Sequence, residues 1–212
     1  REAAQAGESY LDFDCYGTKI GSEEVFVSDD PTIPESMGFY LFDDEGVESR
    51  KRELIKGGVI TDLLHNRETS FKMNIRSNAA SRSVEFDKEP IIRMSNTFIE
   101  PGDYDVTELL SDIKKGVYIK NFMEWNIDDR RENQRYVGFE AYLIKNGELD
   151  INVKSPVLEL TSKKFWSSVD ARSKNLDFKA ANCGKGEPMQ GAPVWTGAPD
   201  VRLRNIRIGN RS

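Results

Sequence analysis

The sequence predicts a β-dominated α+β fold, with an antiparallel sheet or a barrel-like core and a few short helices. From residue 21 onward, short apolar runs alternate with turn residues at roughly ten-residue spacing, which is typical of antiparallel strands. Two pairs of such runs flank glycine-containing turns, and one segment carries both a helix start signal and a helix stop signal. Because no internal repeat, low-complexity tract or linker interrupts this pattern, residues 1–212 are expected to form one domain.

The first elements follow from local periodicity and turn chemistry. An apolar stripe at helical spacing predicts a short helix within residues 1–14. The apolar runs 24–27 and 39–42 are expected as strands, because acidic turn residues follow each of them. Residues 54–60 contain two apolar pairs around a Lys-Gly-Gly turn, and residues 142–151 contain two runs around an Asn-Gly turn. Both segments are predicted hairpins, the second with a type I′ turn.

Two helices are expected in the second half of the chain. Asp105 and Glu108 have the spacing of a capping box, and Gly116, which follows two lysines, is a helix stop signal. This helix is expected to be about three turns long and to pack on a sheet. A second helix is predicted for residues 162–169, where Phe165 and Trp166 belong to the apolar face.

The C-terminal region is expected to be irregular and then to end in a strand. Glycine and proline are frequent between residues 180 and 200, which predicts turns rather than regular structure. Residues 201–208 are predicted to form a closing strand with Arg202 and Arg204 on one face. These arginines could bind phosphate or could protect a solvated edge strand, and the sequence favours the second interpretation.

Charge and apolar run length exclude several classes of protein. The formal net charge is −6, with 30 Lys and Arg against 36 Asp and Glu, so the basic excess of a nucleic-acid-binding protein is absent. No apolar run approaches the ~20 residues of a spanning helix or the ~7–15 residues of a signal peptide. We therefore expect no nucleic-acid partner, no membrane segment and no secretory signal.

The candidate metal ligands of the soft type are few. The chain has one histidine, His65, and two cysteines, Cys15 and Cys183, so it cannot supply a complete Cys/His zinc set. Cys183 is followed by Gly-Lys-Gly, and the neighbouring lysine would favour the metal-binding thiolate. The competing interpretation, which is commoner for a lone cysteine, is a small buried apolar residue.

Other polar residues allow both a functional and a structural interpretation. His65 could act in catalysis, but a single histidine near a strand end is more often a hydrogen-bonded structural residue. The acidic pairs Asp29-Asp30 and Asp128-Asp129 could hold a hard cation, although turn formation is the commoner role. Residues 125–131 combine an aromatic residue with opposite charges, which suits a salt-bridged loop or a polar substrate surface.

Taken together, the motifs and their order along nearly the whole chain resemble the C-terminal domain of the TldD/PmbA family, metallopeptidase-like proteins also called modulators of DNA gyrase. The matching motifs are Asp43-Asp44-Glu45-Gly46-Val47, Gly57-Gly58-Val59, Arg67-Glu68-Thr69, Ser77-Asn78-Ala79 with Arg82, Arg93-Met94-Ser95-Asn96-Thr97-Phe98 with Pro101-Gly102, Ala141 to Gly147, and Cys183-Gly184-Lys185-Gly186. The segment Trp125 to Arg131 resembles the version found in one branch of the family.

The resemblance implies a zinc peptidase that acts on peptides or unfolded polypeptides in the cytoplasm. In that family the metal is held by a His-Glu-x-x-x-His helix and by the cysteine of the Cys-Gly-Lys loop, which corresponds to Cys183. A dimer is implied, formed with a second copy or with a related subunit. The matched motifs make His65, Arg93, Asn96 and Asp128 candidates for substrate binding, while catalytic residues are not identified in this chain.

The chain departs from the family in lacking the histidine pair, and two alignments of its start are possible. If residues 1–6 correspond to the metal motif, both histidines are replaced and the site is inactive. If instead residues 6–11 and 21–23 correspond to the stretch that follows the motif, the metal helix and the N-terminal domain lie upstream of Arg1. The second alignment matches more positions and is preferred.

Two classes of function therefore remain. The first is the C-terminal domain of a zinc metallopeptidase that supplies a cysteine ligand and a substrate channel. The second is a metal-free partner subunit or peptide-binding module of the same family. Cys183 favours the first, because a subunit without metal has no need of a thiol in that loop. Gyrase modulation through nucleic acid has little support in a chain of net charge −6.

Overall fold

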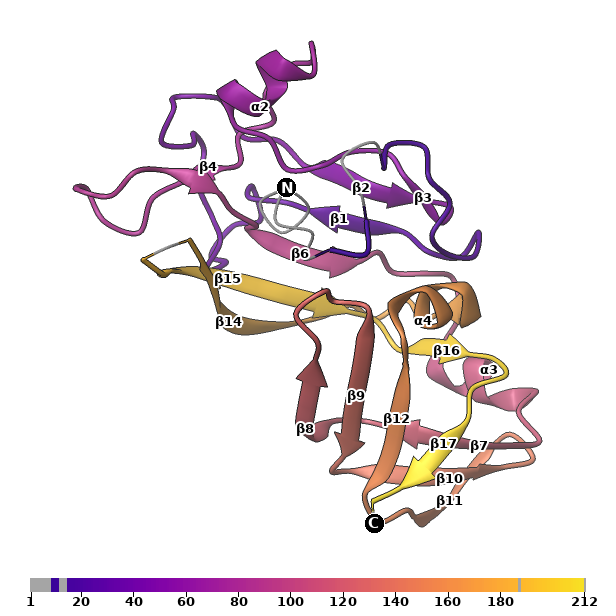
Figure 1. Cartoon of the computed structure of the whole chain (residues 1–212). Coiled ribbons are helices and arrows are strands. Elements are labelled where there is room, and N and C mark those ends of the chain that lie inside the picture. Colours follow the sequence, from indigo (N-terminus) through magenta and orange to yellow (C-terminus); the bar gives the residue numbers. More distant parts are fainter. Residues whose placement is uncertain (1–8, 12–14, 187, 212) are drawn as a thin grey trace.

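The computed structural model of the chain describes residues 9–11, 15–186 and 188–211. Strands predominate in this part of the chain, and they form open sheets, which are antiparallel except for one parallel strand pair (Figure 1). This arrangement confirms the β-dominated α+β class, and the described strands close no barrel. The helix expected within residues 1–14 lies outside the described residues, apart from 9–11, which are not helical.

The largest sheet has six strands and brings the first and last thirds of the chain together. Its strands, in spatial order, are β14 (Asp177–Lys185), β15 (Gln190–Ala198), β6 (Asn96–Ile99), β1 (Val27–Asp29), β2 (Arg52–Lys56) and β3 (Val59–Ile60). β15 runs parallel to β6, and every other neighbouring pair is antiparallel. A short ribbon of β4 (Ser81–Arg82) and β5 (Ile91–Ile92) lies near the turn end of the β14–β15 hairpin (Figure 1).

The remaining sheets form the lower part of the molecule as drawn in Figure 1. A four-stranded sheet has the order β17 (Ile208–Asn210), β12 (Pro156–Thr161), β9 (Asn133–Gly138) and β8 (Phe122–Ile127). A three-stranded sheet has the order β11 (Glu148–Asn152), β10 (Ala141–Lys145) and β7 (Lys115–Ile119). A two-stranded sheet joins β13 (Val169–Arg172) to β16 (Val201–Leu203).

The described helices are short, and one was not predicted. They are α2 (Arg67–Lys72), α3 (Val106–Ser111) and α4 (Ser162–Ser168). The predicted helix at 162–169 is confirmed by α4, whose N-cap Thr161 accepts a hydrogen bond from the Lys164 amide. In α2, Asn66 and Thr69 form a capping box, but six residues are too few for a visible helical period.

The capping box predicted for Asp105 and Glu108 is present at the start of α3, but the expected length was wrong. The helix ends at Ser111, and Gly116 belongs to β7 instead of terminating the helix. Gly116 pairs with Ile144 of β10, and a Cβ at this glycine would lie 3.0 Å from Ile113. The glycine therefore permits close packing between the segment after α3 and the sheet.

The expectation of irregular structure at 180–200 was also wrong. These residues form the two longest strands of the molecule, β14 and β15, which pair from Asp177 with Ala198 to Lys185 with Gln190. Pro193 is tolerated inside β15 because the second neighbour, β6, pairs only with Trp195 to Gly197.

Three strand predictions need correction. The run 24–27 becomes a strand only from Val27 onward, and the run 39–42 contributes an isolated bridge between Phe42 and Glu48. The closing strand at 201–208 is split into β16 and β17. Both predicted hairpins, β2–β3 and β10–β11, are confirmed.

Arg202 and Arg204 are engaged in ion pairs, and β16, which carries Arg202, is an edge strand of a two-stranded sheet. Both bond to Asp170 of β13, at 2.9 Å and 2.8 Å, and both also reach Asp112 after α3. Burial alone would raise the pKa of Asp170, but hydrogen bonds from Arg202 and Arg204 lower it. The two arginines therefore link β16 to β13 and to the end of α3.

Small apolar clusters lie beneath the β1–β3 side of the large sheet. One contains Cys15, Ile20 and Ile60, and the other contains Val25, Val27 and Val169, with Trp166 of α4 packed against it. Cys15 is thus a buried apolar residue of the core. None of the helices in the described part of the chain has the length and apolar character needed to span a membrane.

Candidate functional site

Cys183 lies on β14, one of the two edge strands of the six-stranded sheet, and the residue is partly exposed. It pairs with Ala192 of β15 two positions before the Lys185–Gln190 pair that ends the ladder. The family motif around Cys183 is therefore the end of a regular hairpin.

The main chain at Cys183 is held by Arg93. The Arg93 guanidinium donates one hydrogen bond to the Cys183 carbonyl and another, of 2.8 Å, to the Gln190 carbonyl on the opposite strand. Arg93 is buried, with only 1% of its surface exposed. Because a buried guanidinium is costly unless it is bonded, these contacts fix the two strands to the segment that follows β5.

Further bonds join the same hairpin end to the β4–β5 ribbon. Lys185 Nζ donates to the Ile92 carbonyl at 2.9 Å, and Gln190 Nε2 donates to the Glu89 carbonyl at 3.1 Å. Arg82 donates to the Pro193 carbonyl at 3.2 Å. The partly exposed thiol of Cys183 is therefore presented on a braced element.

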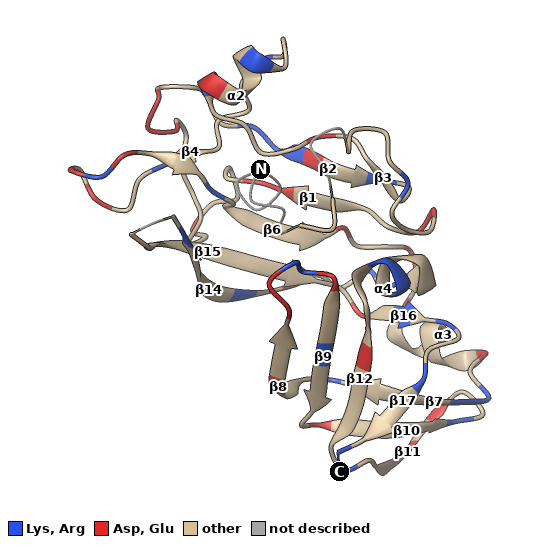
Figure 2. Cartoon of the chain, in the orientation of Figure 1, with Lys and Arg blue, Asp and Glu red and all other residues tan. Residues whose placement is uncertain are grey.

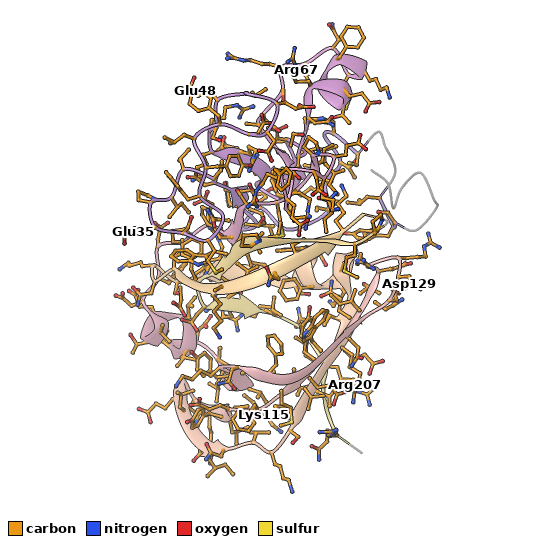
Figure 3. The ribbon with its side chains drawn as sticks, turned by 90° about the vertical axis from the view of Figure 1, so that its left-hand side faces the viewer. Glu35, Glu48, Arg67, Lys115, Asp129 and Arg207 are labelled. Atoms are coloured by element: carbon orange, nitrogen blue, oxygen red, sulfur yellow. The ribbon has the colours of Figure 1, made fainter. Side chains whose placement is uncertain are left out.

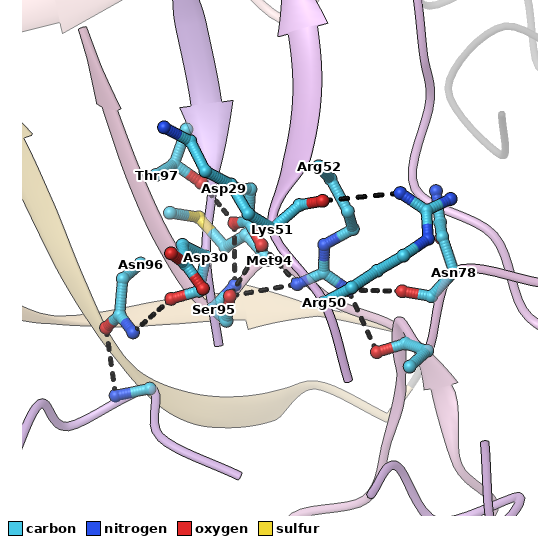
Figure 4. Close-up of polar contacts among 12 residues, drawn as sticks. Asp29, Asp30, Arg50, Lys51, Arg52, Asn78, Met94, Ser95, Asn96 and Thr97 are labelled. Atoms are coloured by element: carbon cyan, nitrogen blue, oxygen red, sulfur yellow. Dashed lines mark hydrogen bonds and ion pairs between the residues drawn. The ribbon is translucent and has the colours of Figure 1, made fainter. Parts of the chain in front are cut away.

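Asn96 lies two strands away from β14, on β6, and is fully buried. Its Nδ2 donates to the Asp30 carbonyl and to Ser36 Oγ, each at 2.7 Å, as Figure 4 shows in part. Its Oδ1 accepts from the Gly38 amide at 3.1 Å and from the Trp195 amide at 3.2 Å. All these contacts are with the protein itself, so Asn96 joins β6 to β15 and to the loop after β1.

A buried ion pair lies beside Asn96 and was not predicted (Figure 4). Asp29 of β1 pairs with Arg52 of β2, and both side chains are completely buried. Asp29 also accepts from the Ser95 amide at 2.8 Å and from Thr97 Oγ1 at 2.6 Å. Burial would lower the pKa of Arg52, but the charge of Asp29 raises it. From the sequence, Asp29 and Asp30 were interpreted as turn residues. The local pattern does not show that Asp29 is a strand residue that faces Arg52.

His65 is buried immediately before α2. Its Nε2 lies 2.8 Å from Tyr16 Oη, and its Nδ1 lies 3.0 Å from Thr69 Oγ1. Its backbone amide donates to Asn78 Oδ1 at 2.8 Å. These contacts join the start of α2 to Tyr16 and to Asn78.

Asp128 organises the turn between β8 and β9. Its carboxylate accepts from the Glu132 amide at 2.8 Å, from the Asn133 amide at 3.1 Å and from Asn133 Nδ2 at 2.6 Å. The hydrogen bond from the Asn133 side chain is the main cause that lowers the pKa of Asp128. The carboxylate therefore has the turn-forming role in this structure.

The structure brings only some of the candidate residues together. Arg93 contacts the Cys183 main chain, and Asn96 holds the neighbouring part of β15. In Figure 3, Arg67 at the start of α2 and Asp129 lie well apart along the molecule, so the His65 and Asp128 regions do not share a site.

The described residues do not fit a complete zinc site. Among them, no group of three His, Cys, Asp or Glu side chains is arranged to hold a metal ion. One thiolate from Cys183 is too few ligands, because structural and catalytic zinc sites use at least three protein ligands.

Comparison with known proteins identifies the family. A model of the PmbA/TldA metallopeptidase C-terminal domain matches residues 1–210. The chain is 39% identical over 189 residues to a metalloprotease of Methanocaldococcus jannaschii, covering 89% of this chain and 41% of that protein. It is 26% identical over 194 residues to a protein of Saccharolobus solfataricus named zinc metalloprotease TldD homolog, covering 90% and 43%. The chain thus spans about two fifths of the length of the curated relatives it matches.

Solved structures share the fold. A protein of Thermotoga maritima described as a modulator of a DNA gyrase superposes with a TM-score of 0.78 at 21% identity, over 98% of this chain and 44% of that one. TldE from Thermococcus kodakarensis superposes with the same TM-score, 0.78, at 19% identity, over 99% and 45%. Together with the match over residues 1–210, these relationships confirm the resemblance found in the sequence: the chain belongs to the PmbA/TldA metallopeptidase family, whose C-terminal domain it matches.

Proposed function

We propose that this chain is the C-terminal domain of a TldD-like zinc metallopeptidase that hydrolyses peptides or unfolded polypeptides in the cytoplasm. The observation that carries the proposal is the family match over residues 1–210. In this proposal the metal helix and the N-terminal domain lie upstream of Arg1, and the present chain supplies one ligand and walls of the substrate channel.

Cys183 is the proposed ligand. Its position on an edge strand and its partial exposure support this role, since a ligand to a metal held by other residues must be reachable from outside the sheet. Cys15 is the alternative thiol, but it is 7% exposed and packs among apolar residues. A thiolate ligand held on a braced strand needs little reorganisation when the metal binds.

The proposed substrate is extended rather than folded. β14 and β8 are each the last strand of their sheet, so one edge of each strand has no strand partner among the described residues. An added peptide strand gains its affinity from main-chain hydrogen bonds, which read little sequence and suit unfolded polypeptides. Roles of His65, Arg93, Asn96 and Asp128 in direct substrate contact stay predictions, since their observed contacts are all internal.

A dimer with a second copy or a related subunit is part of the same proposal. The competing function is a metal-free partner subunit or peptide-binding module. The two functions differ in one measurable quantity, the zinc content of the parent protein.

The test is to replace Cys183 by Ala in the parent protein and to measure bound zinc by elemental analysis. We expect the zinc content to fall clearly, because a ligand to the ion is lost, while Cys15→Ala leaves it unchanged. Zinc that is retained in full after Cys183→Ala contradicts the ligand assignment. A parent protein that binds no zinc before mutation supports the competing function.

A further inference from the structure

An open pocket of about 540 Å³ lies between α2 and the loop that follows Leu41, away from Cys183. Its apolar lining includes Phe42, Phe71 and Ile75, and Phe71 is 86% exposed. A cavity of roughly 150 Å³ already holds a benzene molecule, so this pocket has room for an aromatic side chain. Large apolar side chains gathered at one exposed place indicate an interaction surface.

The lining of the pocket has a small excess of positive charge. Arg67 and Arg76 line it, with Glu48 as the single acidic residue of the lining. Arg67 and Glu48 are labelled near the top of Figure 3. In a chain of net charge −6, a pocket with two arginines and apolar walls favours an acidic partner that carries an aromatic residue.

The chain itself carries such a segment in the loop of residues 83–90, which joins β4 to β5 and projects from the body of the molecule (Figures 1 and 2). Phe86 in this loop is fully exposed, at 104%. Glu85, Asp87 and Glu89 surround it, and Lys88 is the only basic residue of the loop. A fully exposed phenylalanine on a projecting acidic loop has the form of an interface anchor.

The loop and the pocket are neighbours on the surface. The Ser83 amide at the start of the loop donates to Asp44 Oδ2 at 2.6 Å. Gly46 and Val47, two and three residues after Asp44, line the pocket. Since Phe86 is fully exposed, it does not occupy the pocket of its own chain. In a two-fold dimer the same surface patch of both copies meets, so the patch must contain two complementary parts. The loop of residues 83–90 and the pocket are two such parts, and they lie next to each other.

We propose that two copies of this chain exchange these loops reciprocally: Phe86 of each copy enters the pocket of the other between Arg67 and Arg76, with Glu85 and Asp87 facing those arginines. This inference rests on the dimer in the proposed function and is independent of the metal site. It assigns the dimer contact to the end of the molecule that carries α2 and β4.

The first test measures self-association of the parent protein by sedimentation equilibrium. We expect Phe86→Ala to weaken the dimer roughly tenfold or more, because truncation of an aromatic anchor commonly has that effect. Phe139→Ala, which removes another exposed phenylalanine between β9 and β10, is the matched control and leaves the dimer unchanged. Because Phe86 is fully exposed, its loss should not unfold the chain. An unchanged dimer in Phe86→Ala overturns the inference.

A charge-exchange experiment tests reciprocity directly. One variant carries Arg67→Glu and Arg76→Glu, and the other carries Glu85→Lys and Asp87→Lys. Each variant alone is expected to be monomeric, because its loop and its pocket then carry charges of the same sign and repel each other. An equimolar mixture restores both contacts and forms a heterodimer that weakens as salt is added. No heterodimer in the mixture overturns the loop exchange. A wild-type parent protein that is monomeric throughout overturns both the exchange and the dimer, whereas its zinc content still decides the metal proposal.

Discussion

Arg93 and Asn96 belong to one short motif and act on different parts of the main chain. Arg93 holds the carbonyls of Cys183 and Gln190, while Asn96 holds the Trp195 amide. Both side chains therefore position the β14–β15 hairpin from the inside of the molecule. Direct contact of Arg93 or Asn96 with a substrate stays a prediction.

The surroundings of Tyr16 predict how the stability of the protein changes at high pH. Burial, followed by the negative charge of Asp62, raises the pKa of Tyr16 to about 12, above the ordinary value of 10.0. The folded protein thus favours the neutral phenol. This contribution to stability is complete below pH 10.0 and is lost as the pH rises towards about 12.

The Tyr16 prediction is tested by ultraviolet titration of tyrosinate in the wild type and in Tyr16→Phe. The difference between the two curves should have its midpoint near 12. Denaturant unfolding should lose stability above pH 10.0 more steeply in the wild type than in Tyr16→Phe. A difference curve centred on the ordinary tyrosine pKa contradicts the prediction.

At the scale of elements, hairpins with distinctive turns were predictable and the longest hairpin was not. Asn146 and Gly147 both have positive φ, as the type I′ turn between β10 and β11 requires. Between β14 and β15 the glycines and Pro193 hide the strand pattern. Their pairing is stabilised by β6 and by Arg93, which come from a distant part of the sequence. The early end of α3 also could not be predicted from local sequence, because Gly116 belongs to a strand that pairs with β10.

The turn between β2 and β3 gives a prediction about Gly58. Its φ is +76°, and a Cβ there would lie 2.3 Å from the Ser22 carbonyl oxygen. Gly46 has a similar φ of +74° but has open space around it. An alanine at Gly46 therefore measures the cost of the positive φ alone, without a steric clash. We expect Gly46→Ala to cost roughly 1–2 kcal/mol of unfolding free energy. Gly58→Ala should cost about 1–3 kcal/mol more, because the added methyl displaces main chain.

The measurement is the midpoint of urea unfolding for both alanine variants and the wild type. A larger shift in Gly58→Ala than in Gly46→Ala is the expected order. Equal shifts would mean that the 21–22 segment moves away at little cost.

At the scale of the whole molecule, we expect the 212-residue chain by itself to have no metal-dependent peptidase activity and to bind zinc weakly. The physical reason is that Cys183 offers one thiolate, while no group of three ligands is present among the described residues. The measurement is turnover of an unfolded polypeptide with added zinc, alongside equilibrium dialysis of the metal. Turnover that a chelator abolishes would falsify this expectation.

The sequence by itself determined the family, the β-dominated class, the two short hairpins and the start of α3, because motifs, turn chemistry and capping are local in the chain. Only the tertiary structure decided that Asp29 is buried against Arg52, that residues 177–198 form a hairpin, and that Arg93 holds the Cys183 main chain. These contacts join residues that are far apart in sequence, and their stability comes from burial and from pairing that exist only after the chain has folded.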